Sequence, residues 1–216
     1  RSSQEEFALD SRMKSIYARD NGYFKSEICP ITSDDGVIDE DGCIRDTSLE
    51  SMSKLNPVFR NNGSVTAATS SPLTDGAVCM LVCSSEFAEK NGLEPLARIV
   101  TSAVTGCPPN MMGIGPISST QKALERSGWH IDDIDVFEIN EAFSSQSIAV
   151  INELSIDYQK VNIDGGAISI GHPLGASGAR IVGKAASILN RTNSERAIAT
   201  MCIGGGMGIT IVLESP

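Results

Sequence analysis

Gly171-His172-Pro173-Leu174-Gly175 places a histidine between glycines, directly ahead of a predicted helix. Further along, Cys202 ends an apolar run and is followed by the glycine cluster 204–206. Imidazole exchanges protons near neutral pH, and a thiol does so when its surroundings adjust its pKa. Small neighbours let a ligand approach both side chains closely. The two segments therefore predict acid–base chemistry of the kind that acts on a thioester.

Strand and helix patterns alternate around these segments. The predicted strands are apolar runs bounded by turn residues, at 77–83, 96–104, 136–139, 161–170, 197–203 and 209–213. The predicted helices lie at 3–20, 85–90, 119–127, 142–154 and 176–190. The alternation predicts an α/β fold, with a sheet covered by helices and ligand sites at the strand ends. The tight glycine turn makes the last two strands antiparallel, so the sheet is mixed.

The first predicted helix carries two local signals. Ser3 and Glu6 stand at the spacing of a capping box, and Asn21-Gly22 ends the pattern. Its expected buried face holds Leu9, Met13, Ile16 and Tyr17. Beyond it, residues 32–64 are polar and predicted to be irregular, and a long irregular segment is more often functional than idle.

Composition limits the partners. The 216 residues are 41% hydrophobic, which is typical of a globular chain. Their net charge of −10 disfavours binding to nucleic acids and anionic membranes. An anionic ligand therefore needs a local cation or backbone N–H groups. No apolar stretch is long enough to cross a bilayer, and the polar first residues predict no signal peptide. Six cysteines without a Cys-x-x-Cys pair predict free thiols, a reducing compartment and no metal site.

Each candidate residue also has a purely structural interpretation. His172 could cap a turn, and Cys202 considered alone is better explained as a buried thiol like Cys79 and Cys83. Asn140 follows the predicted strand 136–139, so it could orient a water or an oxyanion as well as cap the next helix. The small, polar segment 64–76 could hold a flexible ligand or form a surface turn.

Taken together, four segments resemble the C-terminal part of thiolases, in that family's order and spacing: 65–76, 140–143, 165–175 and 202–204. Residues 104–116 and 199–204 look most like degradative 3-ketoacyl-CoA thiolases of fatty-acid β-oxidation. The resemblance implies part of the loop domain at 1–70 and a thiolase C-terminal domain at 71–216. It also implies that the N-terminal half, which carries the nucleophilic cysteine, is absent.

The resemblance implies specific catalytic roles. His172 resembles the base that activates the nucleophilic cysteine and lines an oxyanion hole. Cys202 resembles the cysteine that exchanges a proton with the α-carbon of acetyl-CoA. Asn140 resembles the residue that holds a water in the first hole, and the backbone at Gly204 resembles part of a second hole. No permanent cofactor is implied.

Coenzyme A is implied as a substrate, held along its length by residues on both predicted domains. Arg45 and Ser51 correspond to the nucleotide end, Ala67 and Ser71 to the pantetheine, and Ala142 and Phe143 to the reacting end.

The resulting hypothesis is the C-terminal portion of a thiolase that cleaves 3-ketoacyl-CoA to acetyl-CoA and a shortened acyl-CoA, inactive without its nucleophile. Alternatives are a biosynthetic acetoacetyl-CoA thiolase and a non-catalytic acyl-CoA-binding or assembly subunit. A sterol-carrier-type thiolase is disfavoured by Asn140. Expected partners are CoA thioesters, the N-terminal half on the same or a separate chain, further copies in a homodimer or tetramer, and a hydratase/dehydrogenase subunit. The expected location is the bacterial cytoplasm or the mitochondrial or peroxisomal matrix.

Overall fold

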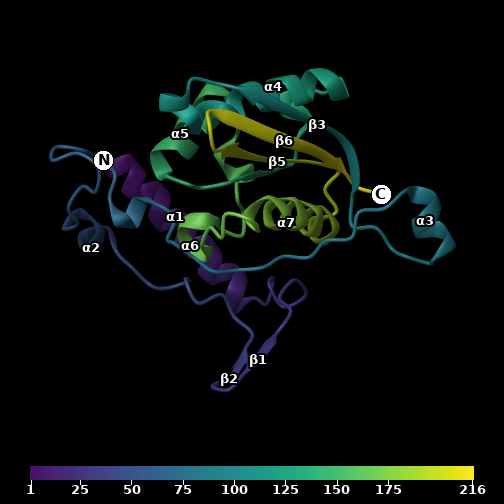
Figure 1. The fold of residues 1–216 in the computed structure, drawn as a ribbon, viewed down its shortest axis with the longest axis horizontal. Helices are drawn as coiled ribbons and strands as arrows, with labels where there is room; N and C mark the ends of the chain where they lie inside the picture. Colours follow the sequence, from purple (N-terminus) through teal and green to yellow (C-terminus); the bar gives the residue numbers. More distant parts are fainter. The chain divides into compact units, whose positions relative to one another are not determined.

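The computed structural model describes residues 1–216 and contains two compact units. Unit 1 consists of residues 1–74, 141–145 and 163–172, and unit 2 consists of residues 75–140, 146–162 and 173–216. Both units are therefore assembled from stretches that lie far apart in the sequence (Figure 1). The domain boundary expected after residue 70 stays a prediction.

Unit 2 is built on a four-stranded sheet with the order β3-β6-β5-β4. Its strands are β3 (Arg98–Gly106), β4 (Val136–Ile139), β5 (Arg196–Ile203) and β6 (Met207–Glu214). Strands β4 and β5 are parallel, whereas β6 is antiparallel to both β5 and β3. The mixed sheet and the final antiparallel pair are confirmed. Because β3, β4 and β5 point the same way, their carboxyl ends meet at one edge of the sheet.

Helices α4 (Gly115–Ser127) and α7 (Ser177–Thr192) cover opposite faces of this sheet (Figure 1). Helix α4 begins four residues earlier than predicted, because Pro116 suits the first turn of a helix. Helix α5 (Ser144–Glu153) follows β4, and three short 3-10 segments lie at Pro109–Ile114, Ile131–Asp133 and Tyr158–Lys160.

A buried hydroxyl network joins α4 to the centre of the sheet. Thr210 Oγ1 lies 2.8 Å from Ser119 Oγ, 3.1 Å from Thr120 Oγ1 and 2.7 Å from Thr200 Oγ1. Thr200 also donates to the carbonyl oxygen of Ile209. Satisfied buried polar networks of this kind favour a single arrangement of the elements that they join. They hold β5 firmly, two residues before Cys202.

Unit 1 centres on α1 (Ser2–Asp20), which ends at Asn21-Gly22 as predicted. It also holds α2 (Leu49–Ser53), α6 (Ala167–Ile170), the 3-10 turn Ala67–Thr69, and a hairpin of β1 (Ile31–Ser33) and β2 (Gly36–Ile38) in the segment expected to be irregular.

Two details of the α1 prediction are wrong. The helix begins at Ser2 with Arg1 as its N-cap and no capping side-chain hydrogen bond. Its buried face is not the large apolar stripe, since Met13 and Tyr17 are exposed. The residues that it buries are small or polar for the most part: Glu5, Phe7, Ala8, Ser11, Arg12, Ser15 and Ala18. The backbone at Gly165 packs directly against α1 at Ser11 and Ser15, and only small side chains permit this close approach.

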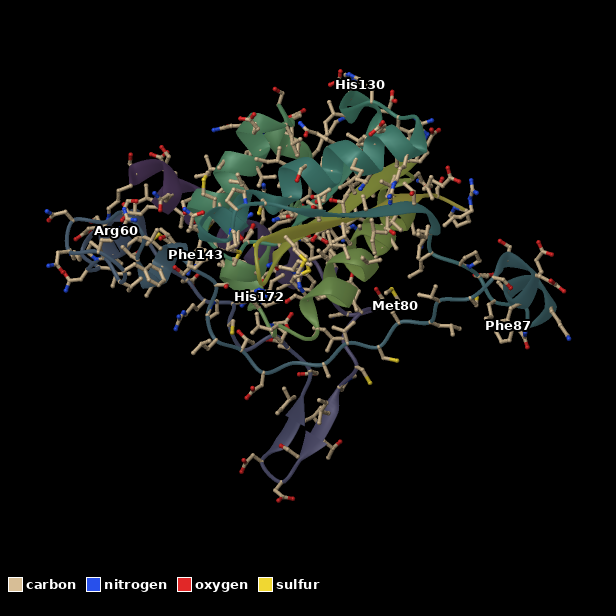
Figure 2. All side chains as sticks on the ribbon, turned by 45° about the horizontal axis from the view of Figure 1, so that its top comes forward. Arg60, Met80, Phe87, His130, Phe143 and His172 are labelled. Atoms are coloured by element: carbon tan, nitrogen blue, oxygen red, sulfur yellow. The ribbon has the colours of Figure 1, made fainter.

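Two predicted strands do not form. Residues 75–84 lie outside any strand, and their apolar side chains, including Met80 and Val82, are exposed. Figure 2 shows Met80 on this stretch and Phe87 on α3 (Ser85–Lys90), away from the sheet of the same unit. Helix α3 has the predicted bounds, and the Ser84 side chain caps it. Residues 161–170 form a turn followed by α6, because Gly165 has a φ of 80° that no regular strand allows.

Candidate functional site

Asn140 and Cys202 lie at the same edge of the unit 2 sheet. Asn140 directly follows β4, and its backbone N–H donates to the carbonyl of Thr200, 3.0 Å away. Cys202 is the penultimate residue of the neighbouring parallel strand β5, and both side chains are buried. Their placement at carboxyl strand ends, where α/β sheets bind ligands, agrees with the prediction.

The environment of Cys202 favours the protonated thiol. Burial raises the pKa of Cys202, and nearby Cys107 raises it further, while a backbone hydrogen bond opposes both. Only 5% of its surface is exposed. A thiol of this kind holds its proton at neutral pH, so it suits a group that gives a proton to a carbanion better than a standing thiolate.

The raised pKa predicts a shifted alkylation profile. The iodoacetamide reaction rate follows the thiolate fraction, so its midpoint for Cys202 is expected at higher pH than for the same cysteine in the urea-unfolded chain. Peptide mapping by mass spectrometry between about pH 7 and 10 measures both profiles. The variant Cys107→Ala is expected to move the Cys202 midpoint to lower pH. A folded-state midpoint at or below the unfolded one would contradict the buried, protonated thiol.

The glycine turn beside Cys202 has one open and one crowded position. A Cβ atom at Gly204 would meet nothing within 4 Å, so its backbone is approachable. Gly206 has a φ of 85° and packs against the carbonyl oxygen of Cys107, whose own N–H donates to Gly206. The turn is thus fixed by the end of β3 and leaves space at Gly204, the predicted second-hole residue.

Gln146 belongs to the same sheet edge and was not predicted. It stands in the first turn of α5, just after β4, and is only 7% exposed. Neither its amide nitrogen nor its amide oxygen has a hydrogen-bond partner, and its Cβ and Cγ pack against Gly113. A buried amide left unpaired is costly, so Gln146 is a candidate to bind a ligand or a water at this sheet edge. The sequence could have indicated Gln146 through its position in the first turn of the helix that follows Asn140.

His172 lies in unit 1, at the end of a short helix rather than at the predicted strand end. It follows α6 through Gly171, whose φ is 107°. Its backbone N–H donates to Thr74 Oγ1 at 3.3 Å, and the same threonine packs against Gly171 too closely for any Cβ there. The imidazole is half-buried, and Figure 2 marks its position. That His172 and Cys202 act at one site stays a prediction.

Four of the residues predicted to bind CoA are brought together in unit 1. The backbone N–H of Ser71 donates to the carbonyl of Ala142 at 3.1 Å, and the Ser71 hydroxyl donates to the same oxygen at 3.3 Å. Ser70 pairs with Phe143 in an isolated antiparallel bridge. Phe143 also makes an edge-on contact with Phe59, with ring centroids 5.8 Å apart. The 3-10 turn containing Ala67 therefore lies beside the Ala142-Phe143 pair.

The remaining two predicted CoA residues, Arg45 and Ser51, are exposed in unit 1. Ser51 stands in the first turn of α2, where its N–H and hydroxyl both contact Ser48 Oγ. Arg45 lies near buried Arg12. Burial lowers the pKa of Arg12, the charge of Arg45 lowers it further, and Glu141 counteracts both. Two guanidinium groups therefore provide a local positive region in this acidic chain.

No cluster of three or more histidine, cysteine, aspartate or glutamate side chains is arranged to hold a metal ion. No helix has the length and apolar character required to cross a membrane.

Comparison with known proteins decides the family. The model of the thiolase C-terminal domain matches residues 93–215, and that of the thiolase N-terminal domain matches residues 1–86. The chain belongs to the thiolase family. The expectation that nothing here corresponds to the N-terminal domain is therefore not supported, because the first 86 residues match its model.

Thiolases with two kinds of name are similar to the whole chain. It is 46% identical to the acetyl-CoA acetyltransferase of Shinella zoogloeoides, of which it covers 56%, and 46% identical to the 3-ketoacyl-CoA thiolase of Aliivibrio fischeri, of which it covers 58%. In both comparisons all of this chain is matched. The chain thus spans little more than half the length of these thiolases.

Solved thiolases share the fold. The structure of human mitochondrial 3-ketoacyl-CoA thiolase in complex with CoA has a TM-score of 0.94 and 39% identity, and the match covers all of this chain and 55% of that one. The acetyl-CoA acetyltransferase of Bacillus anthracis has a TM-score of 0.93 and 40% identity, over all of this chain and 56% of that one. The α/β thiolase fold with a mixed sheet is therefore established.

Proposed function

We propose that this chain supplies the acid–base residues of a thiolase that uses CoA to cleave 3-ketoacyl-CoA into acetyl-CoA and a shortened acyl-CoA. The observation that carries the proposal is Cys202, a buried thiol with a raised pKa, at one sheet edge with Asn140 and the open backbone of Gly204. A protonated thiol there can donate to a carbanion next to a thioester, and preorganised donors can hold the developing oxyanion.

The proposed reaction has two halves. His172 takes the proton of a nucleophilic cysteine, whose sulfur attacks the 3-keto carbon while Asn140 holds a water that helps stabilise the oxyanion. The bond between carbons 2 and 3 then breaks, and Cys202 protonates carbon 2 to complete acetyl-CoA. In the second half, the Cys202 thiolate takes the proton of an incoming CoA thiol, and the CoA sulfur attacks the acyl-enzyme. The shortened acyl-CoA is released as the nucleophilic cysteine leaves and regains its proton from His172.

The nucleophile is proposed to lie on thiolase sequence outside these 216 residues, on the same or a separate polypeptide. Cys202 holds its proton, and the Cys107 sulfur contacts only the carbonyl oxygens of Met111 and Met112 among the partners found for it. Residues 77–83 also support further thiolase polypeptide, because their apolar sequence is typical of a strand buried on both faces and here Leu81 is 70% exposed. The 216 residues alone are therefore proposed to be inactive.

CoA is proposed to extend from Arg45 and Ser51, along Ala67 and Ser71, to Ala142 and Phe143. The contacts of Ser71 with Ala142 and of Ser70 with Phe143 support one continuous binding surface within unit 1. The Arg45 charge, with Arg12 nearby, suits the phosphates of an anionic ligand. Homodimer or tetramer assembly and pairing with a hydratase/dehydrogenase subunit stay predictions.

Complementation tests this function. The chain is mixed with the segment of the Aliivibrio fischeri thiolase that it does not match, and acetyl-CoA and the shortened acyl-CoA are measured by mass spectrometry. We expect no products from the chain alone and CoA-dependent products from the mixture. CoA binding by calorimetry without turnover in any mixture would instead support a non-catalytic acyl-CoA-binding subunit. Comparing acetoacetyl-CoA with 3-ketohexadecanoyl-CoA separates biosynthetic from degradative preference, which relatives of both names leave open.

A further inference from the structure

Three distant stretches of unit 1 meet at one buried carboxylate, that of Glu141. Its Oε2 accepts a hydrogen bond from the Ser11 hydroxyl of α1 at 2.7 Å and another from the Ile168 N–H of α6 at 3.1 Å. The Ser11 oxygen in turn accepts from the Gly166 N–H at 3.1 Å. Glu141 is only 1% exposed. A closed set of hydrogen bonds thus joins α1, residue 141 and the turn that starts α6.

Backbone packing shows that this junction is tight. A Cβ atom at Gly166 would overlap the Glu141 carboxyl group, and one at Gly165 would overlap Ser15. Gly165 also has a left-handed φ of 80°. Ser15 Oγ donates to the Ser11 carbonyl oxygen and occupies the space that a Cβ atom at Gly165 would need. The two glycines let the chain lie directly on the carboxylate and on the small residues of α1.

Hydrogen-bond donors and a cation compensate the buried negative charge of Glu141. Burying a carboxylate is costly unless donors and opposite charge surround it. The hydroxyl and amide supply the donors, and buried Arg12, on the same helix as Ser11, supplies an opposite charge that interacts with Glu141. Arg12 itself donates to the carbonyl oxygens of Ala8 and Ala68, which places it among these elements.

His172 depends on this junction because α6 is a single turn. A helix of four residues has no stability of its own, so its direction is set by contacts at its two ends. Glu141 binds the Ile168 N–H at the start, and Thr74 binds the His172 N–H just after the end. We propose that Glu141 is the positioning residue that fixes the 165–172 segment to α1 and so sets the orientation of His172. The catalytic use of that orientation rests on the proposed function.

Nuclear magnetic resonance tests the proposal without an activity assay. The chain has two histidines, so the ring signals of His172 and His130 can be followed separately during a pH titration. With Glu141→Ala we expect the His172 signals and its titration midpoint to move, and the Gly166 and Ile168 amides to exchange at least about 10-fold faster. His130, on an exposed turn of unit 2, is expected to stay unchanged.

Three further variants separate positioning from general loosening. Glu141→Gln keeps an oxygen that can accept both hydrogen bonds, so it is expected to retain most of the amide protection. Ser11→Ala removes one hydrogen bond to Glu141, so it is expected to change the His172 signals and the amide exchange in the same direction as Glu141→Ala but by less. It keeps the test available if Glu141→Ala fails to fold. Ser48→Ala removes the α2 cap in the same unit and is expected to leave His172 unchanged.

Two results would overturn the proposal. One is a wild-type His172 titration and wild-type exchange in Glu141→Ala, or in Ser11→Ala if the former does not fold. The other is a His172 shift in Ser48→Ala as large as that in the Glu141 variant, which would show non-specific loosening of unit 1. Failure of the complementation assay would instead bear on the proposed reaction and leave these measurements valid.

Discussion

Replacing His172 with alanine is expected to lower turnover of the complemented enzyme by about 100- to 10,000-fold, the range typical of a lost general base. The nucleophilic cysteine would lose the group that accepts its proton in the first half-reaction and returns that proton in the second. The KM for CoA is expected to change little, because Arg45, Ser51, Ala67 and Ser71, which are proposed to hold the nucleotide and pantetheine of CoA, are left in place.

His130→Ala provides the matched control. This second histidine lies on an exposed turn of unit 2, where its ring contacts only Asp132 among the partners found for it. Its removal is expected to leave turnover within about two-fold of wild type, in keeping with ordinary surface substitutions. Steady-state kinetics of the two variants at several pH values compare them directly. Turnover of His172→Ala near that of His130→Ala would remove His172 from the mechanism.

Residues at the ends of predicted strands could be placed from the sequence. Strand 136–139 was predicted with its observed bounds, and the antiparallel pair around the glycine turn followed from the shortness of that turn. Asn140 and Cys202 could therefore each be placed at the carboxyl end of a strand from the sequence. That they share one sheet edge follows from the parallel pairing of β4 with β5, which the local patterns did not specify.

Contacts between distant small residues could not be predicted. The apolar pattern of α1 selected Met13 and Tyr17 as buried, whereas the structure buries Ser11 and Ser15 against a glycine turn. Hydrophobic periodicity detects large apolar side chains and cannot detect a backbone that approaches a serine. For the same reason the sequence did not predict the hydrogen bonds of Glu141, although Glu141 lies within the thiolase-like segment 140–143.

Two predicted strands are absent from the structure, because whether an apolar segment forms a strand depends on residues that are distant in the sequence. Residues 77–83 have the composition of a buried strand, but a strand forms only against another strand, and none of 1–216 pairs with them. Residues 161–170 are apolar enough for a strand, yet the left-handed Gly165 redirects the chain into α6. An apolar run predicts burial, while its secondary structure depends on what it is buried against.

Gly208→Ala is expected to destabilise unit 2 by about 3 kcal/mol, the upper part of the range for overpacked cores. Gly208 faces Gly115, so that an added Cβ would overlap the backbone carbonyl of Gly115 and the nitrogen of Pro116. Backbone atoms cannot rotate away as a side chain can, so α4 would have to move off the sheet. Because Gly208 pairs with Cys202 in the register of β5 and β6, the shift would also reach the proposed acid.

The same substitution at Gly183 is the control, and its expected sign is opposite. Gly183 lies inside α7 with nothing within 4 Å of an added Cβ, so alanine is expected to stabilise the helix by about 0.5–1 kcal/mol. The single tryptophan, Trp129, lies in unit 2 beneath the Arg196 guanidinium, 4.4 Å from the ring centroid, and its fluorescence reports urea unfolding of that unit. Equal unfolding midpoints for Gly208→Ala and Gly183→Ala would show that the contact between the two glycine backbones does not constrain the sheet edge that carries Cys202.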